Sequence, residues 1–584
     1  MAAVLGAQPQ PTIREFTHES QVMGEARAYR AMLPPTYSAS QKRYPVVYWM
    51  HGYETSAEQE QLDREILAYV AQHDVIVVHT GPVDTTGQFP LYFPELVEQV
   101  DKTLRTIPDR DHRAVTGFSA GGFLAFWMAA KYPDLVSSAS SFMGPTEYTI
   151  GPKDFPVECN FDDFYASYDG VRTRLVTGVK DFLAFYDRRL NSIWSYARSG
   201  HETEEFDSPH GTPGLAKTLD FHLAAFAKPL PKPVVFSHAD VYPNFGVWGW
   251  EVASDRTQPG ITVLENVSRT GFRSTVREWI PGGAAIPEVK LTVASPLHLF
   301  PPSSTHRVTL IHLADGKVRH TSLKADAQGR LSFDLDGDAW EVGIGSEPVT
   351  AITGYQFEST GWATAGQPVK LRVWFTNKGG SRLAPIPVQW ESPSPTVKFE
   401  GALGRLFGLA SGESAEVPVT FTCSDPAAAM ARIVAVVGGA HLPLEIPLYP
   451  VAQPTKDFQI ADGRSLTVYQ HATEKGPLLL GEGNGDGFAA PGETFAILLP
   501  DGDAYRAAEL FTSDACVDNS ARVSDSWTPY DQSGASVKYS LPRILSTCQP
   551  GTPIHMLARV VLPNAPNHQV RYFSVEFPVW YRNH

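Results

Sequence analysis

The chain has 584 residues, a formal net charge of −15, 43% hydrophobic residues and 19% charged residues. This length is too great for a single hydrophobic core and predicts about three to four domains of ordinary globular protein. The negative charge argues against nucleic acids and anionic membrane surfaces as partners, because both attract basic patches. No apolar run in the sequence reaches the roughly 18 residues that a membrane-spanning helix requires.

Apolar strands and helices alternate in the first part of the chain. Short β-branched runs that predict buried strands are separated by longer segments with helical periodicity. This alternation predicts a doubly wound, mostly parallel sheet, which is an α/β fold. We expect strands at residues 45–50 and 75–79, and helices at residues 62–73 and 96–106.

A loop rich in aromatic residues is predicted between residues 80 and 94, after the second of these strands. Its position at the carboxyl end of a strand makes Phe89, Tyr92 and Phe93 candidates to line a substrate pocket. The alternative is that the three rings pack in the core, as aromatic side chains often do.

Residues 113–132 carry the clearest chemical motif. Residues 117–121 read GFSAG, which has the pattern G-x-S-x-G, with a short apolar run before it and a helical segment after it. Strand, sharp turn and helix together are the context of a nucleophile elbow, in which the glycines leave room for a strained turn and the serine hydroxyl projects from the sheet. We therefore predict Ser119 as a nucleophile. The alternative is a chance turn of glycine and serine.

An activated serine needs a histidine base and a carboxylate that orients the histidine. Asp181 follows the apolar run RLVTG at residues 174–178, so it lies just beyond the predicted end of a strand. His210 lies in a loop rich in proline and glycine, directly before a predicted helix at residues 215–227. The chain order Ser119, Asp181, His210 is the order of a triad on a doubly wound sheet.

The oxyanion that forms in acyl transfer needs backbone N–H donors. The loop after the first predicted strand reads HGY at residues 51–53. We predict the N–H groups of Tyr53 and Ala120 as the donors. His51 and Gly52 are candidates for substrate contacts. His51 and His201 are also rival candidates for the base, although His51 is tied to the oxyanion loop and His201 lies in a charged stretch that we expect to be solvated.

Residues 28–228, about a third of the chain, resemble the esterase D-like branch of the α/β-hydrolases, which includes carbohydrate esterase family 1 with its feruloyl and acetylxylan esterases. The resemblance implies a serine esterase with Ser119, Asp181 and His210 as the catalytic triad. It also implies an acylated carbohydrate or a small ester as the substrate, and no cofactor for catalysis. The matching segments are residues 44–53, 117–122, 177–182 and 209–211.

Two hypotheses from other classes remain open. The protein could transfer the acyl group to a sugar or lipid alcohol instead of water, because a triad alone does not distinguish the two reactions. It could also be chiefly a carbohydrate-binding or adhesion protein with a vestigial hydrolase domain, because most of the chain lies beyond that domain.

Residues 227–233 read AKPLPKP, which predicts a proline-rich linker and the clearest domain boundary. Beyond it, short alternating strands with frequent turn residues are typical of β-sandwiches. The middle part has an immunoglobulin- or fibronectin-like rhythm, with a predicted hairpin turn at residues 377–380, and resembles modules appended to secreted bacterial enzymes. We predict an α/β domain at residues 1–230 and three β-sandwich domains at residues 231–346, 347–451 and 452–584.

A glycine-rich loop with oxygen-bearing side chains occurs in the last predicted domain. Residues 482–493 read EGNGDGFAAPGE, in which Asn484, Asp486 and Glu493 are candidate ligands for structural calcium. The segment resembles calcium-linked loops of secreted bacterial β-domains, although its spacing is not that of an EF-hand. The alternative is a plain turn of glycine, asparagine and aspartate.

Cysteine content bears on the compartment. Cys516 and Cys548 both lie in the last predicted domain and could form a disulfide under oxidising conditions, with two unpaired thiols as the alternative. The first eight residues show no secretion signal. We expect a secreted or periplasmic protein whose signal is absent from this sequence, rather than a cytoplasmic one, because appended β-modules of this kind are typical of secreted enzymes.

Overall fold

The computed structural model of the protein describes residues 10–53, 56–85, 87–280, 282–358, 361–469, 475–519, 522–524, 538–562 and 569–581. The chain divides into two compact units. The first takes in residues 1–276, 287–304 and 324–337, and the second takes in residues 277–286, 305–323 and 338–584. This division does not test the four predicted domains, which stay a prediction.

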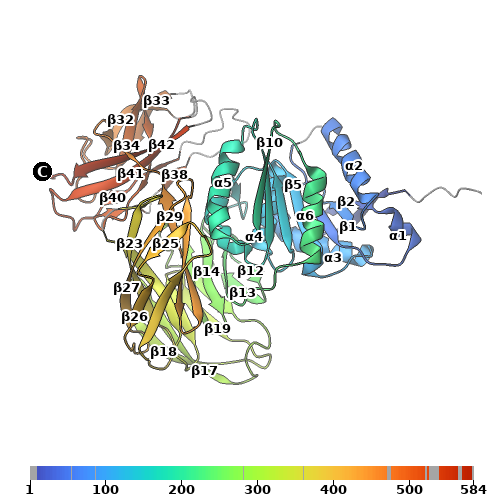
Figure 1. Cartoon of the computed structure of the whole chain (residues 1–584), viewed down its shortest axis with the longest axis horizontal. Helices are drawn as coiled ribbons and strands as arrows, with labels where there is room; N and C mark the ends of the chain where they lie inside the picture. Colours follow the sequence, from blue (N-terminus) through green and yellow to red (C-terminus); the bar gives the residue numbers. More distant parts are fainter. Residues whose placement is uncertain are drawn as a thin grey trace, which may run out of the picture. The chain divides into compact units, whose positions relative to one another are not determined.

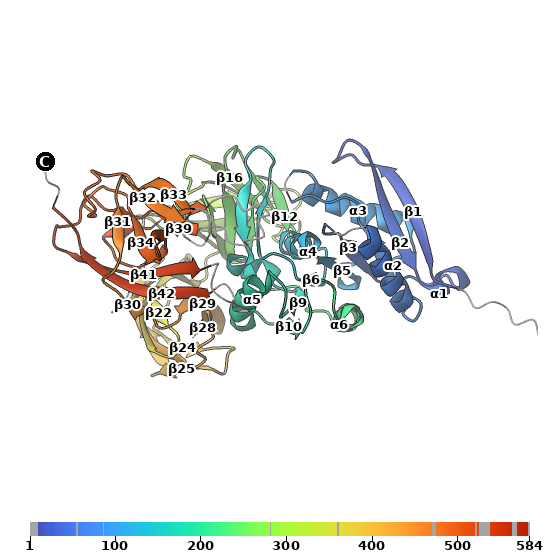
Figure 2. The same cartoon turned by 90° about the horizontal axis from the view of Figure 1, so that it is seen from above.

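An eight-stranded sheet organises the first unit. Its strands are β1 (Thr12–Glu19), β2 (Ala26–Leu33), β3 (Val46–Met50), β4 (Ile76–His79), β5 (Arg113–Phe118), β6 (Ser138–Phe142), β9 (Arg172–Gly178) and β10 (His201–Phe206). They lie in the order β1-β2-β4-β3-β5-β6-β9-β10. β2 is antiparallel to both of its neighbours, and Figure 2 shows it beside β1 at one edge, whereas all other pairs are parallel. The predicted mostly parallel α/β sheet is therefore confirmed.

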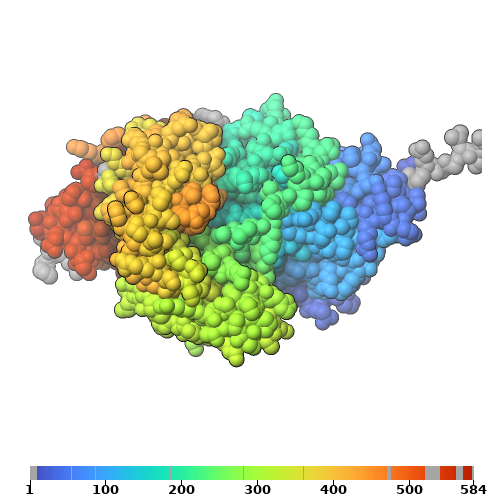
Figure 3. Space-filling view, turned by 60° about the horizontal axis from the view of Figure 1, so that its bottom comes forward, coloured from blue at the N-terminus to red at the C-terminus, as the bar shows by residue number. Residues whose placement is uncertain are grey.

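Helices cover both faces of this sheet. They are α1 (Pro35–Ala39), α2 (Ser56–Val70), α3 (Phe89–Thr103), α4 (Ala120–Lys131), α5 (Ala184–Ala197) and α6 (Leu215–Ala227). Figure 1 shows α5 and α6 on opposite sides of strands β5 and β10. α2 and α6 share one face, because Ile66 and Leu219 join Val77 of β4 in one buried apolar cluster. The blue to green residues of this unit form one continuous surface in the space-filling view (Figure 3).

Helix α3 begins at Phe89, so the loop predicted up to residue 94 is wrong in its second half. Pro90 lies in the first turn of the helix, where a missing N–H leaves no hydrogen bond unmade. Pro94 cannot donate to the carbonyl of Pro90, and that carbonyl instead accepts a hydrogen bond of 2.7 Å from the hydroxyl of Tyr132. A tertiary contact thus stabilises a helix whose prolines are typical of a loop.

Between β6 and β9 the chain forms a small subdomain over helix α4. It consists of the hairpin β7 (Glu147–Ile150) and β8 (Val157–Asn160) and the 3-10 turns Phe161–Asp163 and Tyr165–Tyr168; a further 3-10 turn, Arg110–His112, precedes β5. The ring of Phe161 stacks on Phe123 of α4 with centroids 4.7 Å apart, and the Tyr168 hydroxyl donates to the carbonyl of Phe126 at 2.9 Å. These aromatic residues therefore complete the core around the helix that follows Ser119.

The first unit continues beyond the proline-rich segment that was predicted as a linker. Strand β11 (Phe236–Asp240) carries Asp240, whose carboxylate accepts from the ammonium group of Lys131 in α4 at 2.5 Å. Both side chains of this ion pair are fully buried. The N–H of Trp248 also donates to the carboxylate of Asp134 at 2.9 Å. Helix α4 and the first strands after the linker are thus joined within one compact unit.

The described residues after α6 form strands and no helix. Up to residue 346 the strands are β11, β12 (Phe245–Val247), β13 (Trp250–Ser254), β14 (Ile261–Ser268), β15 (Gly271–Arg277), β16 (Lys290–Ala294), β17 (Thr305–His312), β18 (Val318–Lys324), β19 (Ser332–Asp336) and β20 (Trp340–Ile344). β12-β13-β16-β19 form a four-stranded sheet, β11-β14-β15 are successive neighbours, and so are β20-β17-β18.

Residues 347–451 form two sheets, β21-β23-β27-β25 and β22-β29-β28-β24-β26. The strands are β21 (Thr350–Phe357), β22 (Ala363–Thr364), β23 (Pro368–Asn377), β24 (Ile386–Glu391), β25 (Val397–Glu400), β26 (Leu403–Leu406), β27 (Ser414–Cys423), β28 (Met430–Val437) and β29 (Ala440–Tyr449). The predicted hairpin after Asn377 is wrong, because β23 pairs with β21 and β27, whereas β24 pairs in the other sheet. The buried Asn377 side chain fixes this crossing by donating to the carbonyls of Ser381 and Leu409.

Residues 452–584 contain two larger sheets, β30-β42-β41-β36 and β31-β34-β35-β32-β33, and the pairs β37-β40 and β38-β39. The strands are β30 (Gln453–Pro454), β31 (Gln459–Ala461), β32 (Arg464–Tyr469), β33 (Lys475–Leu480), β34 (Ala496–Asp501), β35 (Ala504–Ala507), β36 (Glu509–Phe511), β37 (Val517–Asp518), β38 (Arg522–Ser524), β39 (Lys538–Ser540), β40 (Arg543–Ile544), β41 (Pro553–Leu562) and β42 (Gln569–Pro578). Cys516 and Cys548 form a disulfide with Cα atoms 5.5 Å apart. The strand-rich character is confirmed, and the packing of these sheets as sandwiches stays a prediction.

The helices of the described part of the chain are all too short or too polar to cross a membrane.

Candidate active site

Ser119 lies between β5 and α4 in a backbone conformation that L-residues rarely adopt, with φ 54° and ψ −125°. Its N–H donates to the carbonyl of Phe142 in β6 at 2.9 Å, and its own carbonyl accepts from the N–H of Gly122 at 2.8 Å. Its side chain makes no capping hydrogen bond to α4. The strained turn predicted from the motif is present, and its hydroxyl is not used to cap the helix.

The glycines on either side of Ser119 are required by close backbone contacts. A Cβ atom on Gly121 would lie 2.0 Å from the carbonyl oxygen of Met50, and one on Gly117 would lie 2.3 Å from the carbonyl oxygen of Gly121. Both distances are far shorter than any van der Waals contact. Strand β3 and the elbow can therefore meet only where side chains are absent.

The loop after β3 lies directly against the elbow. A Cβ atom on Gly52 would lie 2.9 Å from Cβ of Ser119 and 3.5 Å from the nitrogen of Ala120. Tyr53 follows Gly52 in this loop, so the structure brings both predicted oxyanion donors close to the nucleophile. Their role as donors stays a prediction.

Asp181 and His210 meet beyond the carboxyl ends of β9 and β10. Oδ1 of Asp181 lies 2.9 Å from Nδ1 of His210 and also accepts from the N–H of Leu183 at 3.2 Å. The Asp181 side chain is fully buried, whereas the His210 side chain is 23% exposed. Because a carboxylate only accepts, Nδ1 of His210 carries the proton, and Nε2 is left as the acceptor. The predicted pair is thus brought together with the geometry of a histidine held by a buried acid.

Two phenylalanines flank the imidazole of His210. The ring centroids of Phe118 and Phe182 lie 4.6 Å and 4.7 Å from that of His210. Phe118 directly precedes Ser119 and Phe182 directly follows Asp181, so the ring of His210 is in contact with a neighbour of each. The sequence analysis missed both, because their convergence depends on two separate loops.

Exposed apolar side chains gather at these same loops. Tyr53, Val179 and Phe182 are 65%, 47% and 54% exposed. Ile13 is the only other large apolar residue of comparable exposure in the described part of the chain up to residue 230. A patch of this kind on a folded protein marks a binding surface.

His51 is held at both ring nitrogens. Its Nδ1 lies 3.1 Å from Nε2 of Gln59, and its Nε2 lies 3.0 Å from Nδ1 of His79. An amide nitrogen only donates, so Nδ1 of His51 accepts and its Nε2–H donates to His79. Burial, followed by the charge of Arg30, lowers the pKa of His51 to about 4. A neutral imidazole with both nitrogens engaged is a poor general base, which favours His210.

His201 lies in β10 and not in a solvated stretch as expected. Burial, followed by the charge of Arg198, lowers the pKa of His201 to about 3. Its ring meets Trp194 edge-on, with centroids 5.3 Å apart, and its Nδ1 lies 3.0 Å from the hydroxyl of Thr173. This second rival base is therefore a structural residue of the sheet.

The three aromatic residues predicted for a substrate pocket lie in the core. Phe89, Tyr92 and Phe93 are all fully buried in α3. Phe93 meets Tyr48 edge-on and Tyr92 stacks on His18, with centroids 5.5 Å and 5.7 Å apart. The structure matches the packing alternative and corrects the pocket assignment, because rings without exposed surface cannot contact a substrate.

A second carboxyl group is buried near Asp181. Asp187, in the first turn of α5, is fully buried, and neither of its carboxyl oxygens makes a hydrogen bond of normal geometry within the described structure. The same holds for Oδ2 of Asp181. Burial, followed by the charge of Asp181, raises the pKa of Asp187 well above its ordinary range, and Thr177 opposes this only in part. No motif marked Asp187, so the sequence analysis missed it.

The glycine-rich loop predicted to bind calcium is held by carboxylates that face backbone N–H groups. Glu493 is buried and accepts from the N–H groups of Asn484 and Ala490 at 3.3 Å and 3.1 Å. Asp462, which the sequence analysis missed, is buried and accepts from the N–H groups of Asp486 and Gly487, both at 3.0 Å.

Oxygens that point at amide hydrogens do not present a cation shell, so these side chains as arranged do not fit calcium. The described residues include no cluster of three or more histidine, cysteine, aspartate or glutamate side chains placed to hold a metal ion. The calcium prediction stays a prediction and has no part in the chemistry below.

Residues 93–221, which include Ser119, Asp181 and His210, match the family model described as "Putative esterase". The first unit is esterase-like. The resemblance to esterases seen in the sequence is thereby confirmed, and the esterase-like α/β-hydrolase fold covers about the first 220 residues.

Two curated relatives share part of this esterase-like region. Esterase Rv1288 and Esterase MT1326, from two strains of Mycobacterium tuberculosis, are each 31% identical over 149 residues. The match covers 23% of this chain and 33% of the relative, so it spans about a third of the length of these relatives.

Solved structures of esterases are also similar to the esterase-like region. A ferulic acid esterase is 22% identical, with 37% of this chain and 99% of that chain covered and a TM-score of 0.32. A CE1 ferulic acid esterase from Anaeromyces mucronatus is 17% identical, with 37% and 91% covered and a TM-score of 0.31. The S-formylglutathione hydrolase FrmB from Staphylococcus aureus is 15% identical, with 38% and 100% covered and a TM-score of 0.31.

Proposed function

We propose that the esterase-like region hydrolyses carboxylic esters through Ser119, His210 and Asp181. The observation that carries this proposal is the strained turn at Ser119 together with a histidine whose Nδ1 is held by a buried carboxylate. The ring contact between Phe118 and His210 supports their proximity. With Nδ1 protonated, Nε2 of His210 is the atom that takes the hydroxyl proton of Ser119.

The reaction has two halves. Oγ of Ser119 attacks the ester carbonyl as His210 removes its proton, and the N–H groups of Tyr53 and Ala120 stabilise the oxyanion, each donor contributing about 3 kcal/mol. The tetrahedral intermediate expels the alcohol, which takes the proton from His210, and leaves an acyl group on Ser119. Water then attacks this acyl-enzyme by the same route and releases the carboxylic acid. Asp181 stabilises the imidazolium at each stage.

The acyl group that we propose is aromatic, such as feruloyl, in preference to acetyl. The exposed side chains of Tyr53, Val179 and Phe182 support this choice, because an aromatic acyl group would cover apolar surface that an acetyl group leaves in water. A carbohydrate as the alcohol side follows from the family resemblance alone. The mechanism uses no cofactor.

We also infer that the protein acts outside the cytoplasm. The disulfide between Cys516 and Cys548 supports this, because the cytoplasm of most cells keeps thiols reduced.

Hydrolysis of methyl ferulate, para-nitrophenyl acetate and acetylated xylan tests the proposal. We expect the wild type to hydrolyse methyl ferulate best, and Ser119→Ala to lose at least about a thousandfold in kcat. Ser195→Ala, which changes an exposed serine of α5, is the matched control and is expected to keep wild-type activity. Equal activity of wild type and Ser119→Ala would overturn the nucleophile, and a preference for the acetyl esters would overturn the aromatic acyl group.

A further inference from the structure

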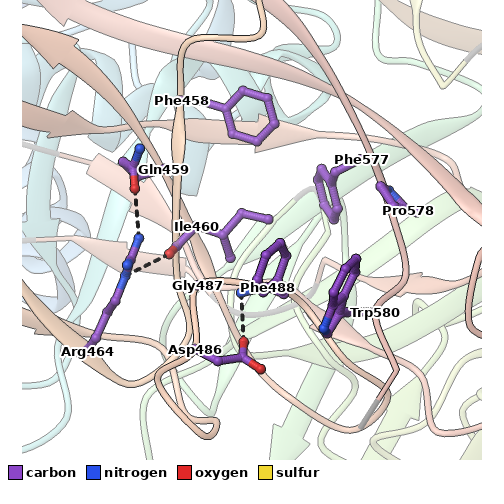
Figure 4. Close-up of a pocket in the computed structure, with 10 residues that line it drawn as sticks. All are labelled: Phe458, Gln459, Ile460, Arg464, Asp486, Gly487, Phe488, Phe577, Pro578 and Trp580. Atoms are coloured by element: carbon purple, nitrogen blue, oxygen red, sulfur yellow. Dashed lines mark hydrogen bonds between the residues drawn. The ribbon is translucent and has the colours of Figure 1, made fainter. Parts of the chain in front are cut away.

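A cavity of about 410 Å³ lies in the C-terminal part of the second unit. It is enclosed by β31, the glycine-rich loop around Gly487 and the chain at the end of β42. Its volume falls in the range of small-molecule sites, roughly 300 to 1,000 Å³. Figure 4 shows Arg464 and Gln459 on one side of this cavity, and Phe577 and Trp580 on the other.

The floor of the cavity belongs to the hydrophobic core. Ile460 and Phe577 line it and are members of the buried cluster that also contains Cys548 of the disulfide. Phe458 packs against the same cluster, and its ring centroid lies 6.3 Å from that of Phe577. A floor made of core residues is already ordered before a ligand arrives, which lowers the entropic cost of binding.

Two stacked aromatic rings form a wall of the cavity. The ring centroids of Phe488 and Trp580 are 4.1 Å apart and their planes differ by 12°. The Phe488 side chain is nevertheless exposed. Its backbone is fixed from two directions, because the carboxylate of Asp462 binds the N–H of Gly487 and the carbonyl of Ala489 accepts from the N–H of Trp580 at 2.9 Å. The carboxylates of the loop thus hold an aromatic platform in place.

Polar groups of both charges complete the lining. Arg464 donates from Nε to the carbonyl of Ile460 and from Nη2 to Gln459, while its Nη1 has no hydrogen bond within the described structure. Each carboxylate oxygen of Asp486 accepts one internal hydrogen bond and keeps a lone pair for another. A charged ligand would be attracted by one of these groups and repelled by the other. A neutral ligand rich in hydroxyl groups can donate to Asp486 and accept from Arg464 at once.

We propose that this cavity binds a sugar ring of a neutral polysaccharide. The carbon face of the ring packs on Phe488, and its hydroxyl groups bond to Asp486 and Arg464. An aromatic platform beside a few convergent polar groups is the arrangement that holds and orients a small polar ring. This site takes no part in ester hydrolysis, so it does not rest on the function proposed for Ser119.

Affinity electrophoresis of the full chain tests the site. The parent protein carries Ser119→Ala, so that no ester of the probe is hydrolysed during the run. The gels contain arabinoxylan, barley β-glucan, glucomannan, the anionic polymer polygalacturonate or no polysaccharide. We expect at least one neutral polysaccharide to retard the parent, and Phe488→Ala to raise the Kd about tenfold or more. Tyr581→Ala, which removes an equally accessible aromatic ring that does not line the cavity, is the matched control and is expected to bind like the parent.

Asp486→Asn supplies a second variant in case Phe488→Ala lowers the melting temperature. Its amide oxygen still accepts the hydrogen bond from the N–H of Phe488, but the negative charge is gone, and we expect weaker retardation at an unchanged melting temperature. The proposal is overturned if none of the neutral polysaccharides retards the parent, if both variants bind as the parent does, or if polygalacturonate alone retards it.

Discussion

The elbow at Ser119 and the loop at residues 482–493 are both glycine-rich turns with polar side chains, but they use those side chains in opposite ways. At the elbow, Ser119 does not cap the helix that follows, and buried oxygens of Asp181 and Asp187 make no normal hydrogen bond within the described structure. In the loop, Glu493 and Asp462 accept the N–H groups of the turn itself. A polar motif therefore indicates chemistry only where the fold leaves its atoms without an internal partner.

The largest expected effect lies at the elbow, where the backbone contacts leave no space. Gly121→Ala places a methyl group 2.0 Å from the carbonyl oxygen of Met50. Overpacking of this kind costs about 1–3 kcal/mol or more, so we expect the melting temperature to fall by at least about 5 °C and esterase activity to be lost. Differential scanning fluorimetry and a para-nitrophenyl acetate assay measure both. Gly354→Ala is the control, since its added Cβ meets nothing within 4 Å, and a stable, active Gly121→Ala protein would contradict the prediction.

Glu493→Gln tests the opposite use of polar atoms in the loop. The variant replaces one carboxylate oxygen by an NH₂ group that faces a backbone N–H, and leaving such a donor unsatisfied costs about 1–3 kcal/mol. We expect amide hydrogen exchange across residues 484–490 to accelerate about tenfold or more. Glu482→Gln, at an exposed glutamate of the same loop, serves as the control. Unchanged exchange in Glu493→Gln would show that the carboxylate does not hold the loop.

Asp187→Asn tests the buried oxygens near the elbow through pH. Because the pKa of Asp187 is raised in the folded state, folding retains a proton that the unfolded chain releases above about pH 4. This contribution to stability is complete below the unfolded-state pKa and is lost as the pH rises towards the folded-state pKa. The variant cannot titrate, so we expect its melting temperature relative to wild type to rise by about 2–4 °C between pH 4 and pH 8.

Thermal melts at several pH values provide this measurement, with the exposed Asp154→Asn as the control. A difference between Asp187→Asn and wild type that stays constant with pH would show that Asp187 titrates normally.

The smallest expected effect concerns calcium. The carboxylates of the loop already accept backbone N–H groups, so we expect excess EGTA, and calcium added back afterwards, to leave the melting curve unchanged. A rise in melting temperature that depends on calcium would restore the calcium prediction and remove the contrast between the two turns.

Local pattern sufficed for much of the α/β region. Helix α6 spans the predicted residues, and Asp181 and His210 meet because both follow the carboxyl ends of parallel strands, as the chain order implied. The start of α3 could not be predicted, because the partner that satisfies the carbonyl of Pro90 is Tyr132, far along the chain. Strand β10 was missed because its sequence HETEEF carries no apolar run.

The contacts around the site were beyond reach for a related reason. Phe118 and Phe182 converge on His210 from loops after different strands, and Asp462 reaches the glycine-rich loop from the strand before it. The sequence shows which residues each segment carries, whereas the pairing of atoms between segments depends on three-dimensional packing. The roles of Tyr53 and Ala120 remain predictions on the same ground.

The buried ion pair between Lys131 and Asp240 bears on how this protein can be taken apart. Lys131 ends the helix that begins at the nucleophile, whereas Asp240 lies beyond the proline-rich segment. A fragment cut at that segment would keep the ammonium group and lose its only counter-charge, and removing one partner of a buried pair costs about 3–5 kcal/mol. The esterase-like region is therefore no interchangeable cassette: recombination or engineering has to move it together with the first strands of its neighbour.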